Sequence, residues 1–89
     1  MIKLIQVIQA NQGNEYYLRE ARVNPSHIVS ITPSDKFIML LHQNQLPEGL
    51  DQHHEFVEIS LSPGRTIIAV GNPKVINEKI EAAKKLLLG

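Results

Sequence analysis

Four histidines are the residues of this chain that most directly suggest chemistry, because imidazole nitrogens bind metal ions and transfer protons. His53 and His54 are adjacent, so on an extended segment their side chains diverge and do not easily share one ion. His42 lies across a loop from both and could approach either one, with Asp51 or Glu55 adding oxygen ligands. The spacing of these residues matches no zinc or copper pattern. We therefore expect no metal centre and no cofactor, and we interpret the histidines as solvent-exposed loop residues.

The residue types of a hydrolytic triad also occur in the sequence. Ser26, His27 and Asp35 have the right chemistry, but there is no Gly-x-Ser-x-Gly elbow to position a serine nucleophile. Glu55 and Glu58 lie on opposite faces if their segment is a strand, which argues against joint acid–base catalysis. A glycine-rich phosphate loop is absent as well. The sequence therefore predicts a protein that is not an enzyme.

Aromatic and basic residues suggest a different chemistry, the base stacking and phosphate contacts of nucleic-acid binders. On a strand Tyr17 and Arg19 share one face, whereas Arg22 belongs to the other. Lys84 and Lys85 could add phosphate contacts. One tyrosine and one arginine per face make a small stacking platform, and nine basic residues against nine acidic ones leave no net charge. We keep a nucleic-acid-binding regulatory β-barrel protein as the alternative function, with these five residues as its site.

The composition bounds the scaffold that must position these residues. The chain has 89 residues, of which 43% are hydrophobic and 20% charged, so it can form one modest core and is too apolar to be disordered. We expect a single domain over residues 1–89. No apolar run reaches the roughly 20 residues that cross a bilayer, the first residues lack a signal-peptide pattern, and cysteine is absent. These features indicate a cytoplasmic protein that has no membrane partner.

Apolar periodicity predicts five or six strands followed by one helix. Asn and Gly at 11–14 predict a hairpin turn, and Phe37–Leu41, the most apolar run, predicts a fully buried strand. Asn72 can cap a C-terminal helix that Pro73 begins. The other strands are expected over 2–8, 15–23, 28–32, 55–61 and 66–70. The expected fold class is mainly β (α+β), a small antiparallel β-barrel or sheet of five to six strands with one C-terminal helix.

Apolar residues exceed what so small a fold can bury by itself. The first strand is apolar on both faces, and the runs 37–41 and 86–88 add further apolar surface. We therefore expect a homo-oligomer, formed by a small non-enzymatic interaction or accessory module that self-associates. The expected contact residues are Ile5, Val7, Met39, Leu41 and Leu87.

Charge and loop length suggest two further contacts. Residues 37–64 hold four acidic residues and no Lys or Arg, while residues 65–89 hold five basic residues and two acidic ones. These are either solvated surfaces or the two sides of a head-to-tail contact between subunits. The loop Gln43–His54, with Leu46 and Leu50, is either a simple connector or a recognition loop for another protein.

Several segments of the second half follow a known order of strand, strand, glycine turn, strand and helix. They are Ile28–Pro33, Val57–Arg65, Ile68–Val70 and Val75–Ile80, and with the opening strand they resemble the FlbD-like small bacterial proteins. This chain departs from that pattern by the inserted segment Phe37–His54, and by Gly71-Asn72-Pro73 in place of a Glu-Ser helix start. The resemblance implies a small barrel-like fold and a cytoplasmic accessory or regulatory role, and it transfers no catalytic residue.

Overall fold

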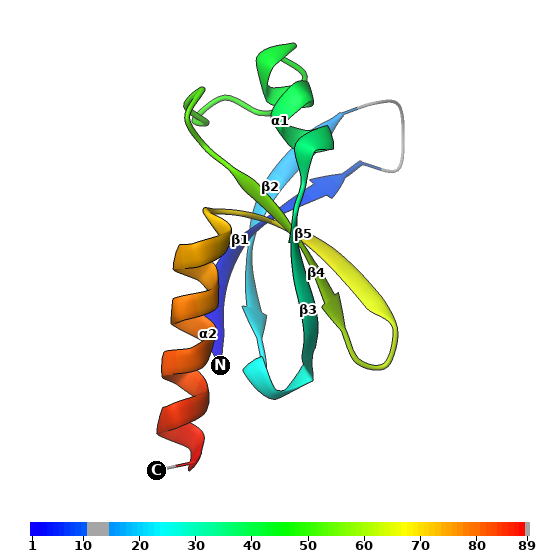
Figure 1. The fold of residues 1–89 in the computed structure, drawn as a ribbon. Helices are drawn as coiled ribbons and strands as arrows, with labels where there is room; N and C mark the ends of the chain where they lie inside the picture. The colour runs from blue at the N-terminus through cyan, green and yellow to red at the C-terminus, as the bar shows by residue number, and fades with distance from the viewer. Residues whose placement is uncertain (11–14, 89) are drawn as a thin grey trace.

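The computed structural model describes residues 1–10 and 15–88, apart from the side chains of Leu87 and Leu88. The expected hairpin turn at 11–14 lies outside the described residues. Five antiparallel strands form one sheet in the order β2-β1-β5-β4-β3, with two helices packed against it (Figure 1). The elements are β1 (Ile2–Gln9), β2 (Tyr16–Val23), the 3-10 turn η1 (Pro25–His27), β3 (Ile28–Pro33), α1 (Asp35–His42), β4 (Phe56–Leu61), β5 (Arg65–Val70) and α2 (Pro73–Leu88). The expected fold class, mainly β with one C-terminal helix, is confirmed.

The sheet is open and is not closed into a barrel. Strands β2 and β3 lie at its two edges, and no ladder joins them over the residues that the structure describes. The chain passes from one edge to the other through η1, where Asn24 Oδ1 accepts a hydrogen bond from the Ser26 amide at 2.9 Å. Pro25 has no amide hydrogen to donate to a ladder, so this corner turns the chain instead of extending the pairing.

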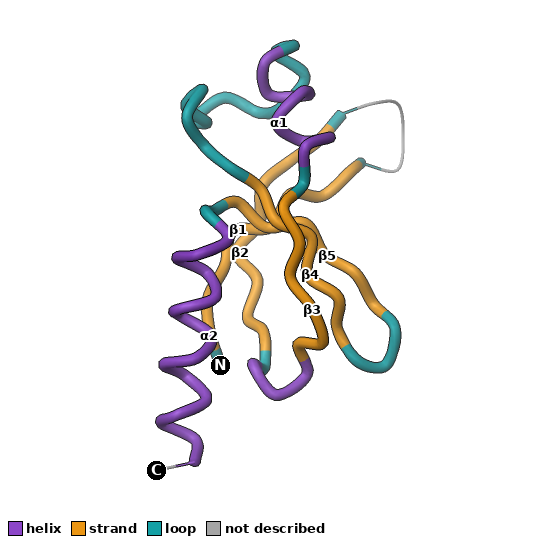
Figure 2. Tube along the Cα trace, viewed as in Figure 1, coloured by secondary structure: helices purple, strands orange, loops and turns teal. Residues whose placement is uncertain are grey.

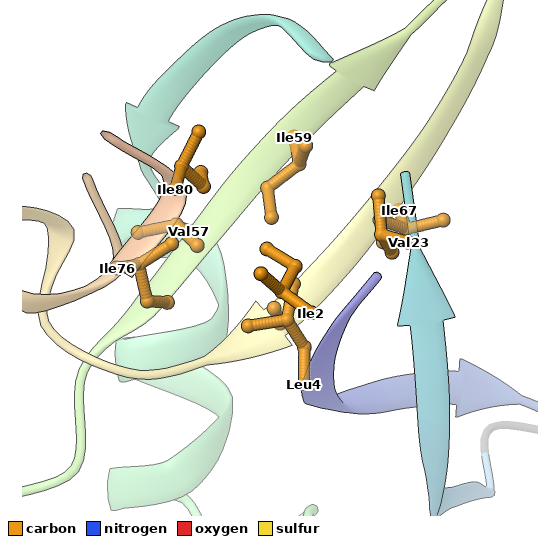
Figure 3. Close-up of a cluster of buried hydrophobic side chains, with 9 residues drawn as sticks. Ile2, Leu4, Val23, Val57, Ile59, Ile67, Ile76 and Ile80 are labelled. Atoms are coloured by element: carbon orange, nitrogen blue, oxygen red, sulfur yellow. The ribbon is translucent and has the colours of Figure 1, made fainter. Parts of the chain in front are cut away.

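One face of the sheet is covered by α2. Ile76 and Ile80 are four residues apart, so they lie on the same side of the helix and pack together against the strands. Val57 and Ile59 are completely buried beneath them, as their alternation with Glu58 along a strand indicates. This first cluster, most of which is shown in Figure 3, contains Ile2, Leu4, Val23, Val57, Ile59, Ile67, Ala69, Ile76 and Ile80.

The opposite face is covered by α1 at the other end of the sheet (Figures 1 and 2). This second cluster contains Val7, Phe37, Leu41 and Phe56. The Phe37 ring meets the Tyr16 ring edge to face, with 5.6 Å between their centroids, and lies 6.1 Å from the Phe56 ring. Strand β1 therefore needs apolar residues on both faces, which explains why its sequence is apolar on both faces.

The expectation of a buried strand at Phe37–Leu41 is wrong, since this run forms most of helix α1. A run of five apolar residues is as compatible with a short buried helix as with a strand. Pro33 ends β3, Ser34 occupies the position before the helix, and Asp35 lies in its first turn, where a negative charge is favourable. Phe37 and Leu41 are buried one helical turn apart, whereas Met39 between them is exposed.

The turn between β5 and α2 depends on a glycine. Gly71 has a φ of +153°, a backbone conformation that favours glycine. A Cβ atom at this position would lie 2.6 Å from Cδ1 of Ile76, which belongs to the first cluster. A side chain at this position would therefore strain the backbone and displace the end of the Ile76 side chain.

We expect Gly71→Ala to lower the free energy of unfolding by about 1–3 kcal/mol, because it combines backbone strain with displacement of Ile76. Gly64→Ala is the matched control, since Gly64 has a φ of +128° but a Cβ atom added there would have nothing within 4 Å. Urea unfolding of both variants measures the difference. Equal losses would show that the contact with Ile76 contributes nothing.

Candidate interaction surface

Ile5 lies where two hollows on the surface of the molecule meet. One, of about 350 Å³, is lined by Ile5, Leu18, Arg19, Glu20, Gly49, Leu50, His54 and Val70. The other, of about 370 Å³, is lined by Lys3, Leu4, Ile5, Glu20, Val70, Gly71, Val75, Ile76 and Lys79. Because Ile5, Glu20 and Val70 line both hollows, we treat them as one depression and call it the Ile5 groove.

The exposure of Ile5 follows from the short pairing between the first and last strands. β5 pairs with β1 only over Ile5–Val7, and β5 ends at Val70 opposite Ile5. Beyond this point α2 lies beside β1, and the Lys79 ammonium donates a hydrogen bond to the Lys3 carbonyl at 3.0 Å. Ile5 thus lies where the sheet gives way to the helix, and 44% of its surface stays exposed.

The start of α2 forms one wall of the groove. Asn72 Oδ1 accepts hydrogen bonds from the amides of Lys74 at 2.9 Å and Val75 at 3.3 Å, which confirms the predicted helix cap. The side-chain amide of Asn72 also donates a hydrogen bond to the Glu55 carboxylate. This cap fixes the first turn of the helix, from which Val75 projects with 60% of its surface exposed.

The loop between α1 and β4 forms the other wall. Leu46 and Leu50 pack against the second cluster, so the fold itself holds the loop. Within the loop, His54 Nδ1 accepts a hydrogen bond from the Asp51 amide at 2.7 Å, and the Asp51 carboxylate accepts one from the His53 amide at 2.6 Å. Leu50 and His54 thereby take fixed positions at the edge of the groove.

Charges of both signs surround the apolar centre of the groove. Lys3, Arg19 and Lys79 line it together with Glu20. Glu20 also lies 3.8 Å from Arg22, but both side chains are more than half exposed, so this ion pair is weak and leaves Glu20 able to bind elsewhere. An apolar centre with a polar rim is typical of protein–protein contact surfaces.

The residues expected at an interface divide into two groups. Ile5 and Met39 are 44% and 61% exposed, and Met39 lies on α1 outside the Ile5 groove. Val7 and Leu41 are 5% and 8% exposed and belong to the second cluster, so they support the fold of this chain. The side chain of Leu87 lies outside the described residues. Val75 was not expected from the sequence, although an apolar residue next to the buried stripe of α2 is a usable signal.

The residues expected at a nucleic-acid site are spread over the molecule. Tyr17 and Arg19 are exposed on one face of β2, while Arg22 belongs to the other face. Lys84 and Lys85 lie in the last turns of α2, at the end that extends away from the sheet (Figure 2). Nucleic-acid binding through these residues stays a prediction.

The arrangement of strands and helices makes this protein a small α+β domain with an open antiparallel sheet. No protein-family model matches the chain, and no curated protein or solved structure is detectably similar to it. The resemblance to FlbD-like proteins therefore stays a prediction.

Over the described residues, neither helix has the length and apolar character needed to cross a bilayer. Within the same part of the chain, no three His, Asp or Glu side chains are grouped so that they could hold a metal ion.

We expect Asn72→Ala to lower the free energy of unfolding by about 1 kcal/mol, because the variant loses the helix cap. Asn77→Ala, in the exposed interior of the same helix, is the control and should be neutral or slightly stabilising, since alanine is the better helix former. Thermal unfolding followed by circular dichroism compares the two variants. A similar loss in both would contradict the capping role.

Proposed function

We propose that this protein is a small non-enzymatic interaction module that self-associates, with the Ile5 groove as the contact surface between two copies. The observation that carries the proposal is the joint exposure of Ile5 and Val75, at 44% and 60%, over one depression. Leu18 and Val70 extend its apolar lining on either side of Ile5. Covering these side chains with a second apolar surface would remove them from water, which is the main favourable term in protein association.

The distribution of charge favours a second copy as the occupant. In a two-fold contact both copies use the same surface, so that if one residue contacts a second residue of the other copy, the reverse contact also forms. Such a surface must therefore be complementary to itself. The groove meets this condition because Glu20 lines both of its hollows, and Lys3 and Lys79 line one of them. Glu20 of one copy can then face a lysine of the other. The equal numbers of acidic and basic residues also prevent net repulsion between copies.

The wider role of the module rests on the sequence. A cytoplasmic location and an accessory or regulatory role stay predictions, as does the binding of another protein through the loop Gln43–His54. The groove provides a point of attachment for such a partner, because Leu50 and His54 belong both to the loop and to the groove. Self-association and partner binding would then use neighbouring parts of one surface.

The first experiment is the mass in solution, measured by light scattering after size exclusion at about 50 mM and about 500 mM salt. We expect twice the chain mass of 10.0 kDa at both salt concentrations, because burial of apolar surface is not screened by salt. A monomer at both concentrations would contradict the proposal. A dimer that dissociates at high salt would contradict the apolar contact and indicate one held by charges.

Substitution by aspartate distinguishes contact residues from core residues. We expect Ile5→Asp to give a folded monomer, since a half-exposed site tolerates a charge that a dimer contact does not. Leu41→Asp should unfold the chain instead, because it buries an unpaired carboxylate in the second cluster. Light scattering and circular dichroism together measure both outcomes.

Val29→Asp is the matched control for Ile5→Asp. Val29 is also an exposed β-branched residue on a strand, with 70% of its surface exposed, but it lies on β3 and outside the Ile5 groove. The control should stay folded and dimeric. If Ile5→Asp also stays dimeric, or if Val29→Asp dissociates equally, the Ile5 groove is not the contact surface.

A further inference from the structure

Helix α2 carries a second row of residues beside the row that packs against the sheet. The buried row contains Ile76 and Ile80, which belong to the first cluster. The residues of the second row repeat at spacings of four, three and four, so they share one side of the helix. We call this row the Val75 stripe: Val75, Lys79, Ala82 and Leu86. Its two ends are exposed, Val75 by 60% and Leu86 by 84%.

The Val75 stripe is continuous with the Ile5 groove. Val75 and Lys79 line the hollow to which Ile5 also belongs. From Lys79 the stripe continues to Ala82 and Leu86, in the part of the helix that extends away from the sheet (Figure 2). The surface available to a second copy therefore does not end at the groove but includes the exposed side of α2.

The stripe has the spacing that one helix needs to receive another. Residues at i, i+3, i+4 and i+7 form a hole that accepts a single side chain from a facing helix. Val75, Glu78, Lys79 and Ala82 have this spacing. If two copies of α2 cross antiparallel at Ala82, residues equally far before and after the crossing point face each other. Leu86 of each copy then lies opposite the hole of the other, and the small side chain of Ala82 lets the helices approach closely.

The charges beside the stripe fit the same crossing. Glu78 lies four residues before Ala82 and Lys85 three residues after it, and both are exposed on the side of α2 opposite the buried row. An antiparallel crossing at Ala82 therefore places Glu78 of each copy next to Lys85 of the other, and the two-fold axis generates this pair twice. Among the described residues, neither side chain forms an ion pair within its own chain. The helix surface is thus complementary to itself in charge as well as in shape.

We propose that α2 of a second copy covers the Ile5 groove, with the two helices antiparallel and crossing at Ala82, and with Leu86 of each copy in the hole beside Val75 of the other. This inference rests on the proposed self-association and names the segment of the partner that occupies the groove. Burial of Leu86 provides the apolar contact, whereas the pairs between Glu78 and Lys85 fix the direction of the helices.

Cysteine cross-linking tests the position of the two-fold axis, because the chain has no cysteine of its own. A disulfide requires Cα atoms within about 7 Å of each other, and equivalent residues of two copies come that close only near the axis. Under mild oxidation we expect Ala82→Cys to form a linked dimer at least roughly tenfold faster than Asn77→Cys. Asn77 is the matched control, since it is exposed on the same helix but faces away from the stripe.

Light scattering of both cysteine variants under reducing conditions separates two kinds of failure. A monomer would overturn self-association and this arrangement together. A dimer in which Ala82→Cys links no faster than Asn77→Cys would overturn the crossing at Ala82 and leave self-association through the Ile5 groove intact.

Exchange of the two charges tests the direction of the helices. Glu78→Lys should weaken the dimer roughly fivefold at low salt, because it places two lysines opposite each other in both pairs. The double variant Glu78→Lys with Lys85→Glu should restore the original affinity. Glu81→Lys makes the same change of charge on an exposed residue farther from the stripe, and it should have little effect. Sedimentation equilibrium measures the dissociation constants, and a double variant as weak as Glu78→Lys alone would overturn the antiparallel pairing.

Discussion

The short pairing of β1 with β5 is the contact on which the rest of this structure depends. It joins the first strand of the chain to the last through Ile5–Val7, and it connects the β1–β2 hairpin to the three strands that follow. Contacts between residues so far apart in sequence must overcome a large loop-closure entropy. Burial supports the pairing on both sides, because Leu4 packs in the first cluster and Val7 in the second.

The limited length of this pairing also shapes the surface. Because β5 ends at Val70, the start of β1 is left for α2 to cover, and Lys79 takes the Lys3 carbonyl that a longer strand could have paired. The same ending leaves Ile5 half exposed beside Val75. The groove proposed as a contact surface is thus a direct result of where the last strand stops.

Most of the fold could be predicted from the sequence because its signals are local. Alternation identifies Val57 and Ile59 as core residues, and Asn72 and Pro73 mark the start of α2. The run Phe37–Leu41 could not be assigned, because its apolar residues fit a helix and a strand equally well, and only packing with Phe56 decides between them. Leu41, expected from the sequence to contact a second copy, packs instead in the second cluster of its own chain, because the helix turns it toward Phe56.

The candidate sites were less predictable, because they depend on contacts between distant segments. Ile5 could be selected as an apolar residue out of phase with Ile2 and Leu4, but its neighbour Val75 comes from a helix at the other end of the chain. Gln6 stands out in the sequence because it is a polar residue within an apolar strand. Only the folded arrangement, however, places Gln6 and Arg65 on the lining of the same cleft beside η1. The choice between an open sheet and a barrel is likewise a matter of whether β2 and β3 meet.

The open sheet has a consequence for how copies of this chain can meet. Free strand edges tend to add further strands and so to polymerise without limit, unless the edge is protected. The edge strand β2 carries Arg19, Glu20 and Arg22, while β3 has a register irregularity between Ile28 and Ser30 and ends in Pro33. Charges, irregular pairing and proline are the usual protections of such edges. Backbone pairing at the edges of the sheet is therefore disfavoured, and the self-association proposed above would use side chains on the surface of the domain.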